Sequence, residues 1–154
     1  MRGSLGSMEP LLNWKIIVSH ALLLLMAGIA SGIFEFHPSS FSPDAVLFNY
    51  FLNHCIMLLV YMAIFAHITY RTDQYPVAHT LLALLLSDEV ASALLAFLLS
   101  YLGAEPEPVR PLQFLVFEYI SLLGVLFAGI KAGISLKHRK LLRSARGGSA
   151  STNA

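Results

Sequence analysis

Four long apolar stretches separated by short polar connectors dominate the pattern of the chain. Each stretch approaches or exceeds the roughly 20 residues that a helix needs to cross the hydrocarbon core of a bilayer. The stretches are continuous and do not alternate as the strands of a membrane barrel would. The pattern therefore predicts four membrane-spanning helices, over residues 16–34, 45–70, 77–102 and 112–136.

The connectors between these stretches are rich in proline, serine and charged residues. Proline inside a connector prevents a continuous helix, and short connectors place consecutive helices side by side and antiparallel. We therefore predict an all-α fold, an integral membrane antiparallel four-helix bundle, over residues 8–136. Residues 1–7 are typical of an expression scar. Residues 137–154 predict a basic and then disordered cytoplasmic tail.

The composition favours the same interpretation. Of the 154 residues, 56% are hydrophobic and 12% are charged, which is about half the charged share of a soluble domain. A soluble fold of this length could not bury so much apolar surface in one core. The single cysteine, Cys55, excludes an intramolecular disulfide and a cysteine-based metal motif.

Positive charge is distributed unevenly along the chain. With four spans, every lysine and arginine except Arg110 falls on the side of the membrane that holds both termini. The positive-inside rule then predicts cytoplasmic termini, and we expect a bacterial inner membrane. The rule also explains the basic run 137–140, so the lipid bilayer is the expected partner and no nucleic acid is expected.

Asp88 and Glu89 lie side by side near the middle of the third span. A charged side chain at the bilayer centre costs about 3 kcal/mol or more, so it is rarely kept without a partner or a role. Carboxylates in a low-dielectric environment can exchange protons near neutral pH, and with imidazole they can ligate cations. Neighbours on a helix point about 100° apart, so only one of these acids can face a small central site.

Other polar residues fall at similar depths, taking a rise of about 1.5 Å per residue. Glu118 in the fourth span and His54 in the second complete the predicted proton- or ion-binding set with Asp88 and Glu89. Asn49, Asn53, Ser92 and Ser121 are the predicted supporting residues. The function favoured by this set is transport or conduction of a proton or a small cation.

Histidines on the first three spans leave a second function open. Layers of histidine in a four-helix membrane bundle suit bis-histidine ligation of haem b, which would make the protein an electron carrier. The candidate haem ligands are His20, His54, His67 and His79. A third hypothesis is an accessory subunit of a larger membrane complex. An enzyme is less favoured, because the chain has no His-Glu-x-x-His zinc motif.

Two small-residue motifs predict close helix contacts. Gly28 and Gly32 lie four residues apart in the first span, as do Gly129 and Gly133 in the fourth. This spacing lets two helix backbones approach closely. The motifs predict either packing within the bundle or a homo-oligomer contact.

Overall fold

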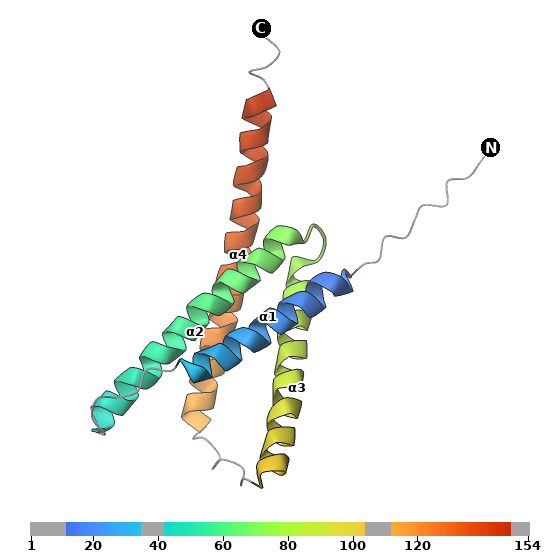
Figure 1. Ribbon diagram of the computed structural model, residues 1–154. Coiled ribbons are helices and arrows are strands. Elements are labelled where there is room, and N and C mark those ends of the chain that lie inside the picture. The colour runs from blue at the N-terminus through green and yellow to red at the C-terminus, as the bar shows by residue number, and fades with distance from the viewer. Residues whose placement is uncertain (1–11, 35–41, 104–111, 149–154) are drawn as a thin grey trace, which may run out of the picture.

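The computed structural model describes residues 12–34, 42–103 and 112–148. These residues contain no strand and form four helices (Figure 1): α1 (Trp14–Ile33), α2 (Pro43–Arg71), α3 (Pro76–Leu102) and α4 (Leu112–Gly148). All four are long and apolar enough to cross a membrane. The predicted fold class is confirmed, and the chain is a small integral membrane protein. The predicted scar at 1–7 and the last residues of the predicted tail, 149–154, lie outside the described residues.

Local chemistry explains where three of the helices start or stop. The side chains of Asn13 and Ser42 each accept a hydrogen bond from a backbone N–H in the first turn of the following helix. Pro43 and Pro76 occupy the first positions of α2 and α3, where a missing N–H costs nothing. Gly103 ends α3 in the left-handed conformation, with φ of 63°, which glycine adopts without strain.

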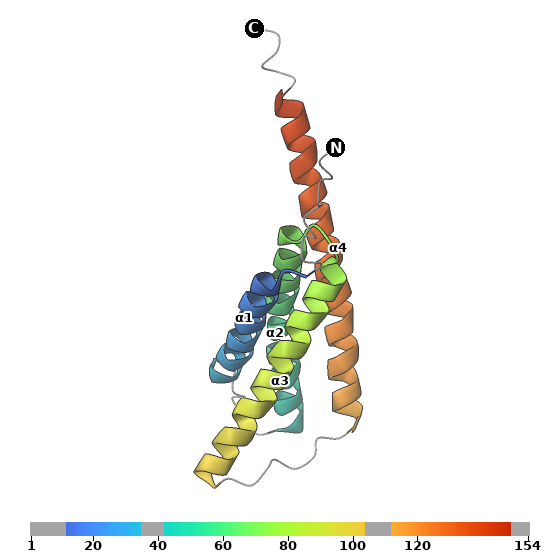
Figure 2. The same ribbon diagram turned by 90° about the vertical axis from the view of Figure 1, so that its right-hand side faces the viewer.

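The helices are packed unevenly. The most extensive contacts join α2 to α4 and α1 to α3, whereas α3 and α4 touch at few places. Figure 2 shows α3 and α4 diverging towards the end of the bundle where α3 stops and α4 begins. The bundle is therefore tight along two helix pairs and open between α3 and α4.

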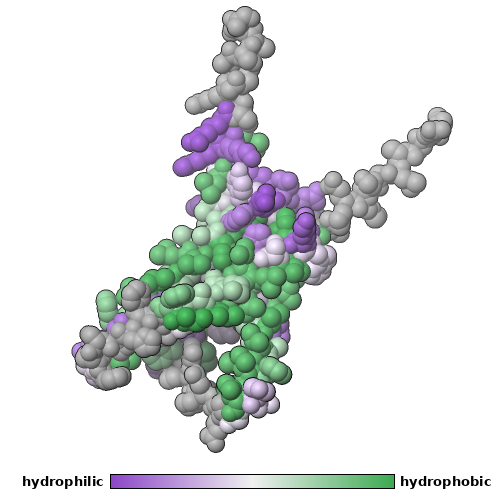
Figure 3. Space-filling model, in the orientation of Figure 1, coloured by the Kyte–Doolittle hydropathy of each residue, from purple (hydrophilic) through white to green (hydrophobic). Residues whose placement is uncertain are grey.

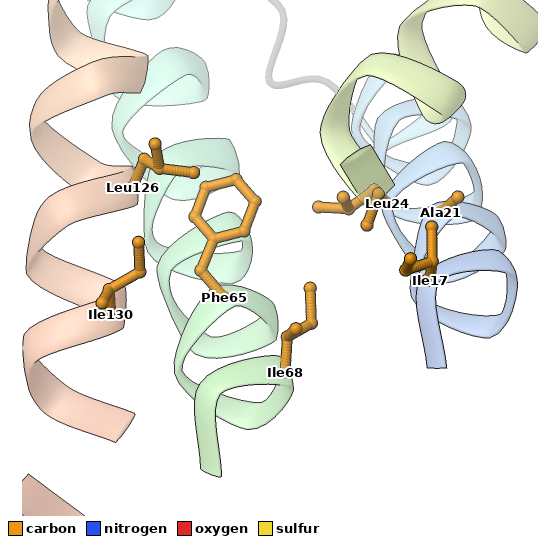
Figure 4. Packing of buried hydrophobic residues seen from close by; sticks show 8 residues of the cluster. Ile17, Ala21, Leu24, Phe65, Ile68, Leu126 and Ile130 are labelled. Atoms are coloured by element: carbon orange, nitrogen blue, oxygen red, sulfur yellow. The ribbon is translucent and has the colours of Figure 1, made fainter. Parts of the chain in front are cut away.

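A small hydrophobic core joins all four helices in one half of the bundle (Figure 4). This half lies towards the basic end, which we define as the end formed by the start of α1, the end of α2 and the start of α3. The core consists of Ile17, Ala21, Leu24, Phe65, Ile68, Ala83, Leu126 and Ile130.

Large apolar side chains remain exposed along every helix, as Met26, Phe97 and Ile120 illustrate at 61%, 66% and 65% exposure. Figure 3 shows hydrophobic residues over the middle of the visible face, with hydrophilic residues gathered towards the basic end. A bilayer would cover such a surface, since its hydrocarbon is as apolar as these side chains.

The glycine motif of α4 packs inside the bundle. A methyl group on Gly129 would lie 2.7 Å from the Cβ of Phe65, and one on Gly133 would lie 2.5 Å from the carbonyl oxygen of Ala66. The α2 backbone therefore occupies the face that a second copy would need. On α1, a methyl group on Gly28 would lie 3.2 Å from the Tyr61 hydroxyl, whereas Gly32 has open space around it. A homo-oligomer contact through Gly28 and Gly32 stays a prediction.

The fourth helix continues through the basic segment to residue 148, twelve residues beyond the predicted span end at 136. Lys137 on this extension forms an ion pair with Asp73, in the turn between α2 and α3, and donates to the carbonyl of Thr72 over 3.0 Å. The ammonium beside Asp73 holds the pKa of that carboxyl below its usual range. These contacts tie α4 to the α2–α3 turn at the basic end.

Candidate functional site

One cavity collects most of the predicted ion-binding residues. Its volume is about 470 Å³, and all four helices contribute to its lining. His54 of α2, Asp88 of α3 and Glu118 of α4 lie on its wall, together with Tyr61 and Ser87. Most of the other lining residues are aliphatic, among them Leu24 of the core layer. The cavity therefore adjoins the core on the side away from the basic end.

The two central acids separate as helix geometry requires. Both acids are exposed in the isolated chain, but Asp88 is among the residues that line the cavity and Glu89 is not. Ser87, one residue earlier, is buried and shares the cavity wall. Of the two acids, Asp88 is therefore the one at the cavity wall, a choice that the sequence alone left undecided.

A polar seam joins α2 to α4 along one wall of the cavity. Tyr50 donates its hydroxyl proton to Glu118 Oε1 over 2.8 Å. One turn along both helices, His54 Nε2 and Ser121 Oγ lie 2.8 Å apart. The Ser121 hydroxyl also lies 2.7 Å from the carbonyl oxygen of Phe117. A carbonyl can only accept, so the serine proton points there and His54 Nε2 donates to the serine oxygen.

Aromatic packing holds this seam in place. The rings of Tyr50 and His54, one turn apart on α2, are parallel within 4° with centroids 6.1 Å apart. Phe114 contacts Tyr50 and Phe117 contacts His54, each at 5.3 Å between centroids. Tyr50 was absent from the predicted set, although its position four residues before His54 was the available signal.

None of the four predicted supporting residues lines the cavity. The amide of Asn49 donates to the Ala45 carbonyl one turn earlier in its own helix, over 2.8 Å. Asn53 is half-buried and Ser92 is exposed, and neither lines the cavity. Ser121 contacts a member of the ion-binding set through its 2.8 Å approach to His54.

The histidines near the basic end have structural contacts. His79 is buried, and its Nε2 accepts the backbone N–H of Asn13 over 2.9 Å, while its Nδ1 donates to the Tyr75 carbonyl over 3.0 Å. The buried His20 uses Nδ1 to donate to the Ile16 carbonyl over 2.8 Å. His79 therefore fastens the start of α1 to the first turn of α3.

The contacts of His54 and His79 do not favour these two residues as haem ligands, whereas the buried Nε2 of His20 has no hydrogen-bond partner in the described part of the chain. Both ring nitrogens of His79 are occupied, and the His54 ring is bonded through Nε2 to α4. His20 and His67 meet edge to face with centroids 5.2 Å apart, so no macrocycle fits between them. Among the described residues, no group of three histidine, cysteine, aspartate or glutamate side chains is placed to hold a metal ion.

No family model, curated protein or solved structure matches this chain.

Proposed function

We propose that the protein moves a proton or a small cation across the membrane through the cavity lined by His54, Asp88 and Glu118. The observation that carries this proposal is the convergence of these three titratable side chains, from three helices, on one cavity. Asp88 is the central binding group. His54 and Glu118 lie towards the end of the bundle away from the basic end.

The need to neutralise Asp88 supports this assignment. A carboxylate at mid-span is costly unless a partner, a proton or a cation compensates its charge. The cavity is large enough to admit water or a hydrated ion beside the acid. Tyr61 and Ser87 supply hydroxyl groups on the same wall, so an ion that sheds part of its hydration shell finds replacement oxygen ligands.

The packing suggests which part of the bundle has to move. The core layer around Leu24 and Phe65 separates the cavity from the basic end. An ion has to pass this layer to complete the crossing. Because α3 and α4 touch at few places, a shift of α3 relative to α4 disturbs the fewest contacts. We infer that such a shift opens the path through the core layer. We also infer that both termini lie in the cytoplasm of a bacterial cell.

The proposal is tested by ion flux into liposomes that contain the purified protein, followed with an internal pH-sensitive dye and then with cation-sensitive dyes. Asp88→Asn is expected to reduce flux to the level of empty liposomes. Glu89→Gln is the matched control, because it removes an acid of the same type one residue away and outside the cavity wall. Wild-type flux in Asp88→Asn, or equal losses in both variants, would contradict the role of Asp88.

A second candidate, an accessory subunit of a larger membrane complex, is favoured by one observation. The Glu89 side chain is exposed near mid-span, where contact with lipid is costly, and a partner helix carrying a hydrogen-bond donor would cover it. Gentle extraction followed by native mass spectrometry is expected to show a partner that Glu89→Leu releases. A single uncomplexed chain under the gentlest extraction would argue against this candidate.

A further inference from the structure

One stripe of side chains on α2 and one on α4 line a common cavity where α2 approaches the basic end. The lining positions on each helix follow the spacing i, i+3, i+4 and i+7, which places them on one face. Between the stripes lies a second cavity of about 650 Å³. Its lining includes Ala63 and Tyr70 of α2, and Leu136, Arg139, Lys140 and Arg143 of α4.

The charge of this cavity is of one sign. Among the residues that the structure describes, three cationic side chains line it and no carboxylate does. Arg139 and Arg143 are one helical turn apart, and a guanidinium group binds phosphate oxygens in a bidentate manner. Lys140 lies over the ring of Tyr70, with its Nζ 5.7 Å from the centroid, which holds the ammonium at the cavity wall. The cavity therefore suits a phosphate-bearing anion.

The order of side chains along the cavity suits an amphiphile. Both α2 and α4 run towards the basic end here, so Ala63 lies about 10 Å deeper than Tyr70 along α2, and Leu136 lies about 10 Å deeper than Arg143 along α4. The apolar positions are thus on the side of the bilayer interior and the cations on the side of its surface. A free phosphate ion would make no use of the apolar half.

We propose that this cavity is a binding site for the headgroup of an anionic phospholipid. Arg139 and Arg143 hold the phosphate, Lys140 adds a third positive charge, and an acyl chain lies along Ala63 and Leu136. Basic pockets between membrane helices are suited to such lipids. The site is separate from the cavity that Asp88 lines, and it does not depend on ion transport.

Fluorescence quenching in liposomes tests this site. The reporter protein carries Trp14→Phe and Tyr70→Trp, so its one tryptophan lies in the proposed site. Quenching by phosphatidylglycerol with brominated acyl chains is compared with quenching by brominated phosphatidylcholine. Each cation near an anionic headgroup contributes about fivefold, so the three cations together would give a preference for phosphatidylglycerol of up to about a hundredfold, and we expect at least about tenfold.

Two triple variants of the reporter separate a built site from general surface charge. Replacing Arg139, Lys140 and Arg143 by glutamine is expected to abolish the preference. Replacing Lys15, Arg71 and Lys131 by glutamine removes the same amount of positive charge outside the cavity. This variant is expected to keep most of the preference for phosphatidylglycerol. Circular dichroism checks that both variants remain helical.

Three results would overturn the proposal. The first is equal quenching by the two lipids. The second is equal loss of preference in the two triple variants, which would indicate diffuse attraction to the membrane surface. The third is loss of the preference on adding inorganic phosphate at matched ionic strength, which would indicate a site for a soluble anion.

Discussion

Substitution of Gly133 by alanine tests the contact on which the α2–α4 pair depends. The added methyl group would lie 2.5 Å from the Ala66 carbonyl oxygen and 2.6 Å from the Cβ of Thr69. Ordinary contacts need about 3.5 Å, so the two backbones must separate by roughly 1 Å. Because the nearest atom belongs to the backbone, no change of side-chain rotamer can relieve the clash.

Two opposing effects determine how much stability Gly133→Ala loses. Overpacking of a tight interface costs about 1–3 kcal/mol, and a separation of the helices also weakens the contacts of Gly129 with Phe65 and Met62. Alanine offsets part of this loss through its better helix propensity, worth about 1 kcal/mol. We expect Gly133→Ala to lower the free energy of unfolding by about 2 kcal/mol.

Gly124→Ala is the matched control on the same helix. A methyl group at Gly124 meets nothing within 4 Å, so this variant is expected to equal or exceed wild type by up to about 1 kcal/mol. Unfolding of both variants is followed by circular dichroism during titration of mild detergent micelles with sodium dodecyl sulfate. Equal stability of the two alanine variants would refute the reasoning that α2 and α4 meet through Gly133.

Three further predictions follow from individual contacts. His79→Phe leaves the Asn13 N–H without its acceptor. In the same titration, the free energy of unfolding should be about 1–3 kcal/mol lower than that of wild type. Asp73→Asn should be less stable than wild type at neutral pH, and the gap should close below about pH 4. Lys137 lowers the pKa of Asp73, so the ion pair stabilises the fold above the ordinary pKa of the carboxyl, and this stabilisation is lost as the pH falls through the lowered pKa. A stability difference between Asp73→Asn and wild type that does not change with pH would exclude this pair as the cause. Tyr50→Phe removes the 2.8 Å hydrogen bond to Glu118 and should cost about 1 kcal/mol while slowing liposome flux.

The helices were predictable from the sequence because membrane spans follow from length and apolarity. The faces of these helices were not predictable in the same way. Lipid is as apolar as the bundle interior, so the side chains of α3 carry little information about which face is inward. The choice between Asp88 and Glu89 therefore needed the positions of α2 and α4. The close approach at Gly129 and Gly133 was the exception, since only small residues permit it.

Two features show where sequence patterns and physical causes differ. The predicted end of the fourth span, at 136, marks the end of apolarity, but α4 continues to Gly148. Lysine, arginine and leucine are good helix formers in water as well, so the helix propensity of the residues after 136 allows α4 to continue beyond the apolar span. The role of His79 was also hidden, because a contact with the backbone of residue 13 depends on how α1 and α3 pack.

The most direct test of the transport proposal compares wild-type flux with the flux of three single variants, two at position 88 and one at position 89. Asp88→Asn is expected to abolish flux, Asp88→Glu to restore part of it because the carboxylate is kept, and Glu89→Gln to match wild type. Full flux through Asp88→Asn, or no flux in the wild-type protein with any of the tested ions, would contradict a transport role for this cavity.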